Sequence, residues 1–198
     1  MKAFINLVLL VVLFALGAQA QTWSIDYAHS PINFSINHYF TPVYGRFQRF
    51  SGKMDFDPAN PKEAKIDFST DIESVNTDNV KRDNDLLSAH FFDAKRFPKM
   101  TLRSTSVERI SESNFRLLGQ LSIHGLTRDV EIPFKIMGFG EHPVKKSLNL
   151  IGLKSEFKIS RTDYGVGSGD WMNTLVVGDE VSVVIVIEAT TMQIKNPK

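Results

Sequence analysis

The sequence predicts an all-β protein, an antiparallel barrel or sandwich of about eight strands accompanied by one helical segment. Three observations support this fold class. Apolar and polar residues alternate over most of the chain after residue 21, which is the period of strands with one buried face. The alternating runs are joined mostly by short turns. Only the stretch from Ser74 to Pro98 interrupts the pattern for long.

The clearest alternation begins at residue 32. Ile32, Phe34, Ile36 and His38 share one face of this predicted strand, and polar residues occupy the other. Further strand-like runs lie at residues 47–56, 64–73, 100–107, 115–123, 130–136, 148–159 and 181–187. Pro133 has no backbone N–H, so we expect one stretch of its strand to lack a partner.

The helical segment is predicted near residues 76–95. It opens with polar side chains that accept hydrogen bonds from free backbone N–H groups, and it is followed by a proline, which ends helices. Val80, Leu87 and Phe91 recur at helical spacing and form an apolar stripe. Such a stripe needs an apolar surface, so we expect the segment to lie across one end of a barrel. The alternative is an ordinary surface helix that caps a sandwich core.

The first twenty residues predict export. An apolar run at residues 4–16 is too short to span a membrane and leads into Ala18-Gln19-Ala20, a small-residue cleavage site. We therefore expect residues 1–20 to be a signal peptide and residues 21–198 to form one domain. Cysteine is absent, so stability must come from a core instead of disulfides. Without Lys2, the 23 basic side chains fall to 22, equal to the 22 acidic ones, which argues against nucleic acid as a partner.

The barrel interior is the main candidate for a binding site. The inward rows assigned by alternation carry no charge and contain Phe34, Ile36, Phe56, Phe68, Leu121, Ile123, Phe134 and Ile185. Such a lining suits an alkyl or prenyl chain, which gains free energy with each buried methylene group. Glycines at Gly52 and Gly119 on these rows would leave room for it. The competing interpretation is a barrel packed solid by its own side chains, as protein interiors usually are.

Three polar residues are candidates for contacting a ligand headgroup. His38 continues the inward row at a strand end, although a neighbouring carbonyl group would satisfy a buried imidazole equally well. Arg82 and Arg161 each have an aspartate nearby in the sequence, which favours structural ion pairs, but an arginine can also hold a phosphate or quinone oxygen. No nucleophile elbow and no metal-binding histidine spacing occurs, so neither a catalytic residue nor a metal ligand is predicted.

Short motifs along nearly the whole mature chain carry a family resemblance. They include Trp23-x-Ile25-Asp26 with His29-Ser30, Phe34-x-Ile36-x-His38, Gly45-x-Phe47-x-x-Phe50-x-Gly52, Ser74-Val75-Asn76-Thr77, Phe97-Pro98, Gly119-x-Leu121-x-Ile123-x-Gly125-x-Thr127, Arg161-x-Asp163-Tyr164-Gly165 and Gly178-Asp179-Glu180-Val181. In these motifs the chain resembles the YceI family of periplasmic, lipocalin-like proteins. The resemblance implies an up-and-down barrel of about eight strands, the width at which a barrel holds its own side chains or one slender ligand.

The resemblance also implies a function. A family member is expected in the periplasm as a carrier or store for an isoprenoid lipid, either a polyprenyl phosphate or an isoprenoid quinone. It needs no cofactor besides that lipid and is not an enzyme. Two alternatives remain: an enzyme that acts on such a lipid through His38 and a nearby carboxylate, and a secreted stress-related module with a filled core.

Two further expectations concern movement and assembly. Phe91 and Phe92 lie in the helical segment and are predicted to act as a lid over the cavity. Residues 181–187 are apolar on both faces, with Val184 and Val186 pointing outward, which predicts a homodimer that covers them. The alternatives are that the helical segment covers this row, or that a register break buries both faces.

Overall fold

The computed structural model describes residues 21–193, so the predicted cleavage after Ala20 lies outside the described residues. The strands are β1 (Thr22–Ile25), β2 (Ile32–His38), β3 (Thr41–Phe47), β4 (Phe50–Asp55), β5 (Lys65–Asp71), β6 (Val75–Asn76), β7 (Lys99–Arg109), β8 (Asn114–Ile123), β9 (Leu126–Glu141), β10 (Leu148–Ser160) and β11 (Val177–Met192). The helices are α1 (Val80–Leu87) and the 3-10 turns η1 (Tyr27–His29), η2 (Pro61–Glu63), η3 (Ile72–Ser74), η4 (Thr162–Tyr164) and η5 (Gly169–Met172). None of these helices is long and apolar enough to cross a membrane.

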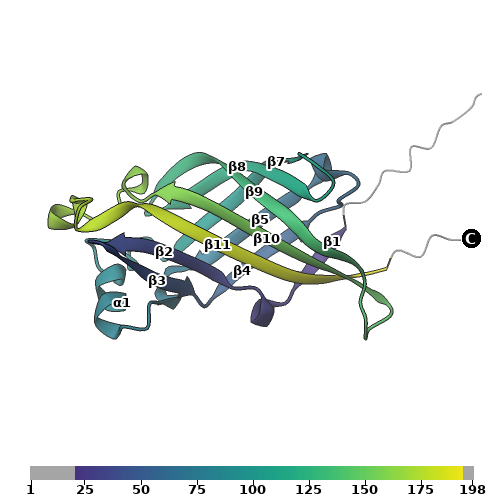
Figure 1. The fold of residues 1–198 in the computed structure, drawn as a ribbon, viewed down its shortest axis with the longest axis horizontal. Helices are drawn as coiled ribbons and strands as arrows, with labels where there is room; N and C mark the ends of the chain where they lie inside the picture. The colour runs from purple at the N-terminus through teal and green to yellow at the C-terminus, as the bar shows by residue number, and fades with distance from the viewer. Residues whose placement is uncertain (1–20, 194–198) are drawn as a thin grey trace, which may run out of the picture.

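Eight antiparallel strands form the predicted closed barrel, in the order β1-β4-β5-β7-β8-β9-β10-β11, and β1 pairs with β11 to complete the ring. Strand β11 is shared: its last part pairs with β1, and its first part pairs with β2. The β2–β3 hairpin therefore extends the wall at the end of the barrel that carries α1 (Figure 1). This end, with the β2–β3 turn, residues 77–97 and residues 161–176, is called the helix end below.

The helix is shorter than predicted, because only residues 80–87 of the expected 76–95 are helical. It begins where the Asn79 side chain accepts a hydrogen bond from the Arg82 N–H at 3.0 Å. It ends at Ser88, whose extended backbone turns the chain away. The apolar residues beyond it lie in turns, and Asp93 has a φ of 46°, which no helix allows. The stripe predicted burial correctly for Phe91, which is 7% exposed, but wrongly for Val80, which is 78% exposed at the start of the helix.

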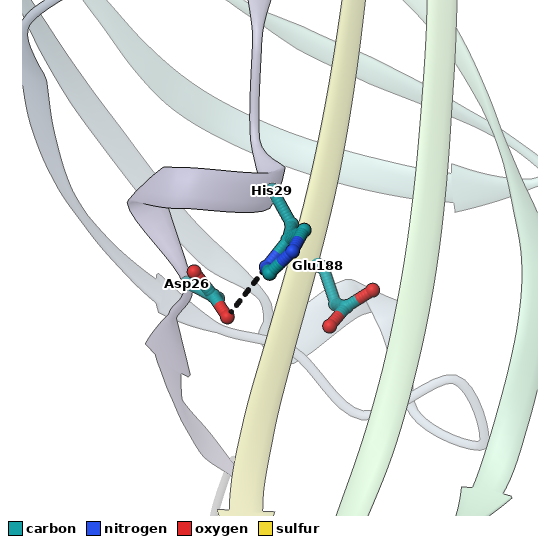
Figure 2. A group of neighbouring side chains, drawn as sticks. All are labelled: Asp26, His29 and Glu188. Atoms are coloured by element: carbon teal, nitrogen blue, oxygen red, sulfur yellow. Dashed lines mark hydrogen bonds and ion pairs between the residues drawn. The ribbon is translucent and has the colours of Figure 1, made fainter.

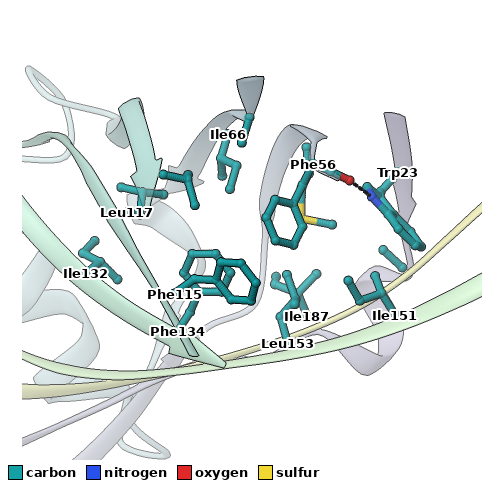
Figure 3. Close-up of a cluster of buried hydrophobic side chains, with 14 residues drawn as sticks. Trp23, Phe56, Ile66, Phe115, Leu117, Ile132, Phe134, Ile151, Leu153 and Ile187 are labelled. Carbon is teal, nitrogen blue, oxygen red and sulfur yellow. Dashed lines mark hydrogen bonds between the residues drawn. The ribbon is translucent and has the colours of Figure 1, made fainter. Parts of the chain in front are cut away.

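The half of the barrel away from the helix end is filled by its own side chains. The rings of Phe56, Phe115 and Phe134 pack against one another, with centroids 5.4 to 5.7 Å apart (Figure 3). The indole N–H of Trp23 donates to the Phe56 carbonyl oxygen at 2.7 Å, which satisfies that donor inside the core. This packed half closes one end of the barrel to solvent.

Strands β9 and β10 separate towards the helix end, as the proline in β9 predicts. Their pairing stops at Ser155 and Phe134, next to Pro133, while β9 continues to pair with β8. The Ser155 hydroxyl donates to the Pro133 carbonyl oxygen at 2.6 Å and marks the last contact of the two strands there. Pro133 has no N–H to donate, so it lies where the ladder ends.

Candidate functional site: an apolar cavity at the helix end

A cavity of about 180 Å³, partly open to solvent, occupies the half of the barrel near the helix end. Six of the side chains predicted to face inward line it: Phe34, Ile36, Phe68, Leu121, Ile123 and Ile185. Strands β2, β5, β8 and β11 contribute them, so the lining is assembled from distant parts of the chain. Most lining side chains are apolar, so the lining matches an alkyl chain better than a polar solute.

The other two predicted lining residues, Phe56 and Phe134, do not line the cavity. Both share the inward phase of their neighbours, but they belong to the packed half, where their side chains are 0% and 9% exposed. Alternation reports only the face of the sheet, and these two residues lie further along the barrel, where rings from facing strands meet. The hollow and the solid interpretations of the barrel therefore each describe one half of it.

Two glycines shape the cavity wall, and one predicted glycine does not. Phe34 pairs with Gly45 and Phe68 pairs with Gly52 across neighbouring strands, and in each pair the ring covers the glycine. A Cβ at Gly45 would lie 2.3 Å from the Phe34 ring. Gly119, in contrast, faces the backbone of the neighbouring strand, where a Cβ would lie 2.4 Å from the Arg103 carbonyl oxygen. Gly119 leaves no room in the bore.

Arg161 is the one charged residue on the cavity wall among the residues that the structure describes. Its side chain is only 4% exposed, and its guanidinium donates to four backbone carbonyl oxygens at 2.7 to 2.8 Å, those of Val166, Trp171, Val177 and Gly178. A guanidinium has five N–H groups, so one N–H has no acceptor among residues 21–193. The other polar residues of the lining are Thr70, Thr101 and Tyr164, and none of them carries a charge.

The charge of Arg161 is held by carbonyl dipoles and not by a paired carboxylate. Burial lowers the pKa of Arg161, and the negative charge of Asp179 acts in the opposite direction. Asp179 itself accepts from the Thr162 hydroxyl at 2.7 Å and the Thr162 N–H at 3.1 Å. Burial raises the pKa of Asp179, but its hydrogen bonds from Ser160 and Thr162 and the charge of Arg161 outweigh this and leave it lowered. Asp179 is therefore held by Thr162, and among the described residues it forms no ion pair with the guanidinium.

The loop after β10 wraps the guanidinium closely. Gly167 has a φ of +91°, and a Cβ there would lie 2.3 Å from an Arg161 guanidinium nitrogen. Glycine alone can approach so closely in this conformation. Tyr164 and Val166, from the same loop, line the cavity and were not among the predicted residues. The Arg161-x-Asp163-Tyr164-Gly165 motif was the available signal, but alternation does not apply in a loop.

The other two headgroup candidates lie away from the cavity lining. His38 is at the end of β2, and its ring contacts that of Tyr39 with centroids 4.5 Å apart. Arg82 donates to the Thr77 hydroxyl and to the Thr77 carbonyl oxygen, both at 2.7 Å. It therefore organises the turn that precedes α1.

The predicted lid residues both line the cavity. Phe91 is 7% exposed and contacts Trp171 with ring centroids 5.5 Å apart, while Phe92 contacts Phe47 at 6.0 Å. The segment is joined to the loop after β10 by a hydrogen bond from the Ser168 N–H to the His90 carbonyl oxygen at 2.8 Å. The two segments cover the cavity together.

A cluster of titratable residues also lies where η1 meets β11. Asp26 caps the start of η1, His29 is its last residue, and Glu188 lies beside them on β11 (Figure 2). Their ligand atoms lie within 4.8 Å of one another, and the His29 Nδ1 lies 3.0 Å from an Asp26 carboxylate oxygen. The hydrogen bond to Asp26 and the charge of Glu188 raise the pKa of His29, and His29 lowers the pKa of Asp26. These interactions describe an ion-pair cluster that attaches η1 to β11.

Comparison with known proteins identifies the fold and the family. The YceI-like domain model matches residues 23–189. Protein YceI of Salmonella arizonae is 33% identical over 171 residues, which cover 83% of this chain and 87% of that protein. The crystal structure of the Campylobacter jejuni YceI protein has a TM-score of 0.70 at 32% identity, covering 77% of this chain and 87% of that one. A polyisoprenoid binding domain from Saccharophagus degradans, implicated in plant cell wall breakdown, has a TM-score of 0.63 at 16% identity, covering 87% of this chain and 99% of that domain. The chain belongs to the YceI-like domain family.

Proposed function

We propose that this protein binds one isoprenoid lipid in the cavity, as a carrier or store. The observation that carries the proposal is a half-hollow barrel whose apolar wall holds a single buried cation, Arg161, with one unused N–H donor. The polyisoprenoid binding domain of similar fold supports the ligand class. The prenyl chain lies against the wall at Phe34, Phe68 and Leu121, and an oxygen of the headgroup accepts from Arg161.

The headgroup is either a quinone carbonyl or a phosphate, since both offer oxygen acceptors to a guanidinium. A binding role is favoured over catalysis, because His38, which the enzymatic alternative requires, is not among the residues that line the cavity. Export to the periplasm through the predicted signal peptide fits a protein that handles membrane lipids.

Native mass spectrometry of protein purified without detergent tests the proposal. A bound mass that extraction identifies as an isoprenoid, and that rebinds unchanged to delipidated protein, is the expected result. Protein that carries no lipid and takes up none would overturn the lipid-binding role. Consumption of the added lipid would establish an enzyme instead.

A substitution of Arg161 tests the proposed contact with the headgroup. Arg161→Lys keeps the charge but cannot reproduce four carbonyl contacts and a free donor, so we expect weaker binding of quinones and prenyl phosphates. The matched measurement uses a prenyl hydrocarbon without oxygen, whose affinity should not change. Equal losses for both ligands would show that Arg161 only supports the fold.

A homodimer stays a prediction. Val184 and Val186 point outward as expected, but both are half-buried. They are paired with Glu156 and Lys154 of β10, whose side chains form an ion pair at 2.6 Å beside them. Neighbouring strands thus cover part of this apolar row. Light scattering at tens of micromolar protein decides between monomer and dimer.

A further inference from the structure

The helix end carries a group of exposed apolar side chains, called the rim here: Tyr39 and Phe40 in the β2–β3 turn, and Met172 and Leu175 in the segment before β11. Phe40 is 98% exposed and Leu175 is 80% exposed. Large apolar side chains gathered on a surface in this way mark a contact site for another apolar body.

The two parts of the rim are held side by side. The Tyr39 N–H donates to the Val176 carbonyl oxygen at 2.9 Å, and His38 pairs with Val177 in the sheet. The β2–β3 turn and the segment before β11 therefore project together from the helix end (Figure 1). The rim is a fixed feature of the barrel wall.

The rim is continuous with the cavity. Trp171 lies next to Met172 in the chain and contacts Phe91, which lines the cavity. Val177, which follows the segment of Leu175, also lines it. Because the packed half fills the other end of the barrel, the rim lies at the end that holds the cavity.

Charge is nearly absent from the rim. Residues 38–44 contain no acidic or basic side chain apart from His38, and residues 168–176 contain only Asp170. A surface built this way has little attraction for a charged partner and matches an uncharged apolar phase.

From these observations we propose that the rim docks onto a lipid bilayer and inserts Phe40 and Leu175 among the acyl chains. A prenyl chain then passes from the bilayer into the cavity without exposing its methylene groups to water, which is the unfavourable step of any free transfer. This inference rests on the proposed lipid-binding function, but the docking can be measured without it.

Vesicle binding tests the docking directly. We expect the mature protein to co-sediment with phosphatidylcholine vesicles, and we expect Phe40→Ser with Leu175→Ser to weaken this binding at least tenfold. Val144→Ser is the matched control, because Val144 is 81% exposed in the β9–β10 connection at the opposite end, and it should bind as the parent does. Added phosphatidylglycerol or 0.5 M salt should change binding less than twofold, since ~0.5 M salt screens charge but not apolar contact.

Transfer kinetics separate the two proposals. The rate at which a fluorescent prenyl lipid leaves donor vesicles should rise with vesicle concentration for the parent and fall at least tenfold in the double variant. The affinity for farnesol, measured without vesicles, should be the same in both proteins. If the parent fails to bind vesicles, or if the double variant transfers lipid at the parent rate, docking is overturned. If farnesol and longer prenyl lipids do not bind at all, the lipid-binding function fails, whereas vesicle binding still reports on the rim.

Discussion

The ring of Phe34 covers Gly45, the residue paired with it on the neighbouring strand. The ring occupies the space that a Cβ would take, and Phe68 covers Gly52 in the same manner. An aromatic ring that covers a cross-strand glycine stabilises the sheet. In this barrel the pairing also keeps two phenyl rings against the wall, which leaves the bore open for a ligand.

Gly45→Ala should narrow the cavity. The three atoms nearest to the new Cβ would all belong to the Phe34 ring, so the ring must move towards the bore, and we expect the affinity for a prenyl lipid to fall about tenfold, or ~1.4 kcal/mol. Gly138→Ala is the control, because nothing lies within 4 Å of a Cβ there. Titration calorimetry with both variants measures the effect. Unchanged affinity in Gly45→Ala would show that the ligand does not reach this part of the wall.

The packed half should be far more sensitive to truncation than the cavity wall. Phe56→Ala removes a ring that is 0% exposed from a three-ring cluster, so we expect a loss of ~3–5 kcal/mol in the free energy of unfolding. Phe68→Ala removes a ring that already borders a cavity and should cost clearly less. Denaturant unfolding compares the two variants. Equal losses would mean that the barrel is packed alike along its length.

The predicted lid should control the rate at which ligand enters and leaves the cavity. Phe91→Ala with Phe92→Ala opens the cover of the cavity, so ligand exchange should accelerate at least tenfold. Stopped-flow displacement of a fluorescent lipid measures this rate. A steep drop in melting temperature without faster exchange would identify the segment as core and not as a lid.

Arg82 should matter for stability and not for binding. Arg82→Ala removes two hydrogen bonds to Thr77, and we expect a loss of about 1–3 kcal/mol in unfolding free energy. Lys81→Ala, at the exposed neighbouring position, should change stability by less than about 0.5 kcal/mol. Lipid affinity should be unchanged in both. A selective loss of affinity for prenyl phosphates in Arg82→Ala would instead place the headgroup at the start of α1.

The contact between Asp26 and His29 should be lost both at high pH and at low pH. The hydrogen bond to Asp26, with help from Glu188, raises the pKa of His29, so its stabilising effect is present at low pH and is lost as pH rises through the folded pKa. His29 lowers the pKa of Asp26, so that contribution is present above the unfolded pKa and is lost as pH falls through the folded one. The pair is therefore intact only between the two folded pKa values.

An NMR titration of the His29 ring checks this assignment. Its midpoint should lie above the ordinary value of about 6.5, and Asp26→Asn should bring it down towards that value. A midpoint that Asp26→Asn leaves in place would contradict the proposed contact.

The faces of the strands and the antiparallel all-β class follow from the alternation of residues, whereas the choice of a barrel over a sandwich rested on the family resemblance. Alternation is a local property of the pleated backbone, so Phe34, Ile36 and Leu121 could be assigned to the interior from their phase alone. Pro133 likewise indicated an interrupted ladder, because a missing N–H acts wherever the residue lies. These predictions needed no knowledge of the residues that the chain later brings into contact.

Where the barrel is hollow depends on contacts between strands that are distant in the sequence. Phe56 and Phe68 have the same inward phase, yet one fills the packed half and the other borders the cavity, because this depends on which side chains face them from distant strands. The sequence offered Arg161 as a headgroup candidate beside His38 and Arg82, and only the folded loop shows that four of its N–H groups donate to backbone carbonyls. Burial and hydrogen-bond partners are properties of the assembled chain, and no local pattern contains them.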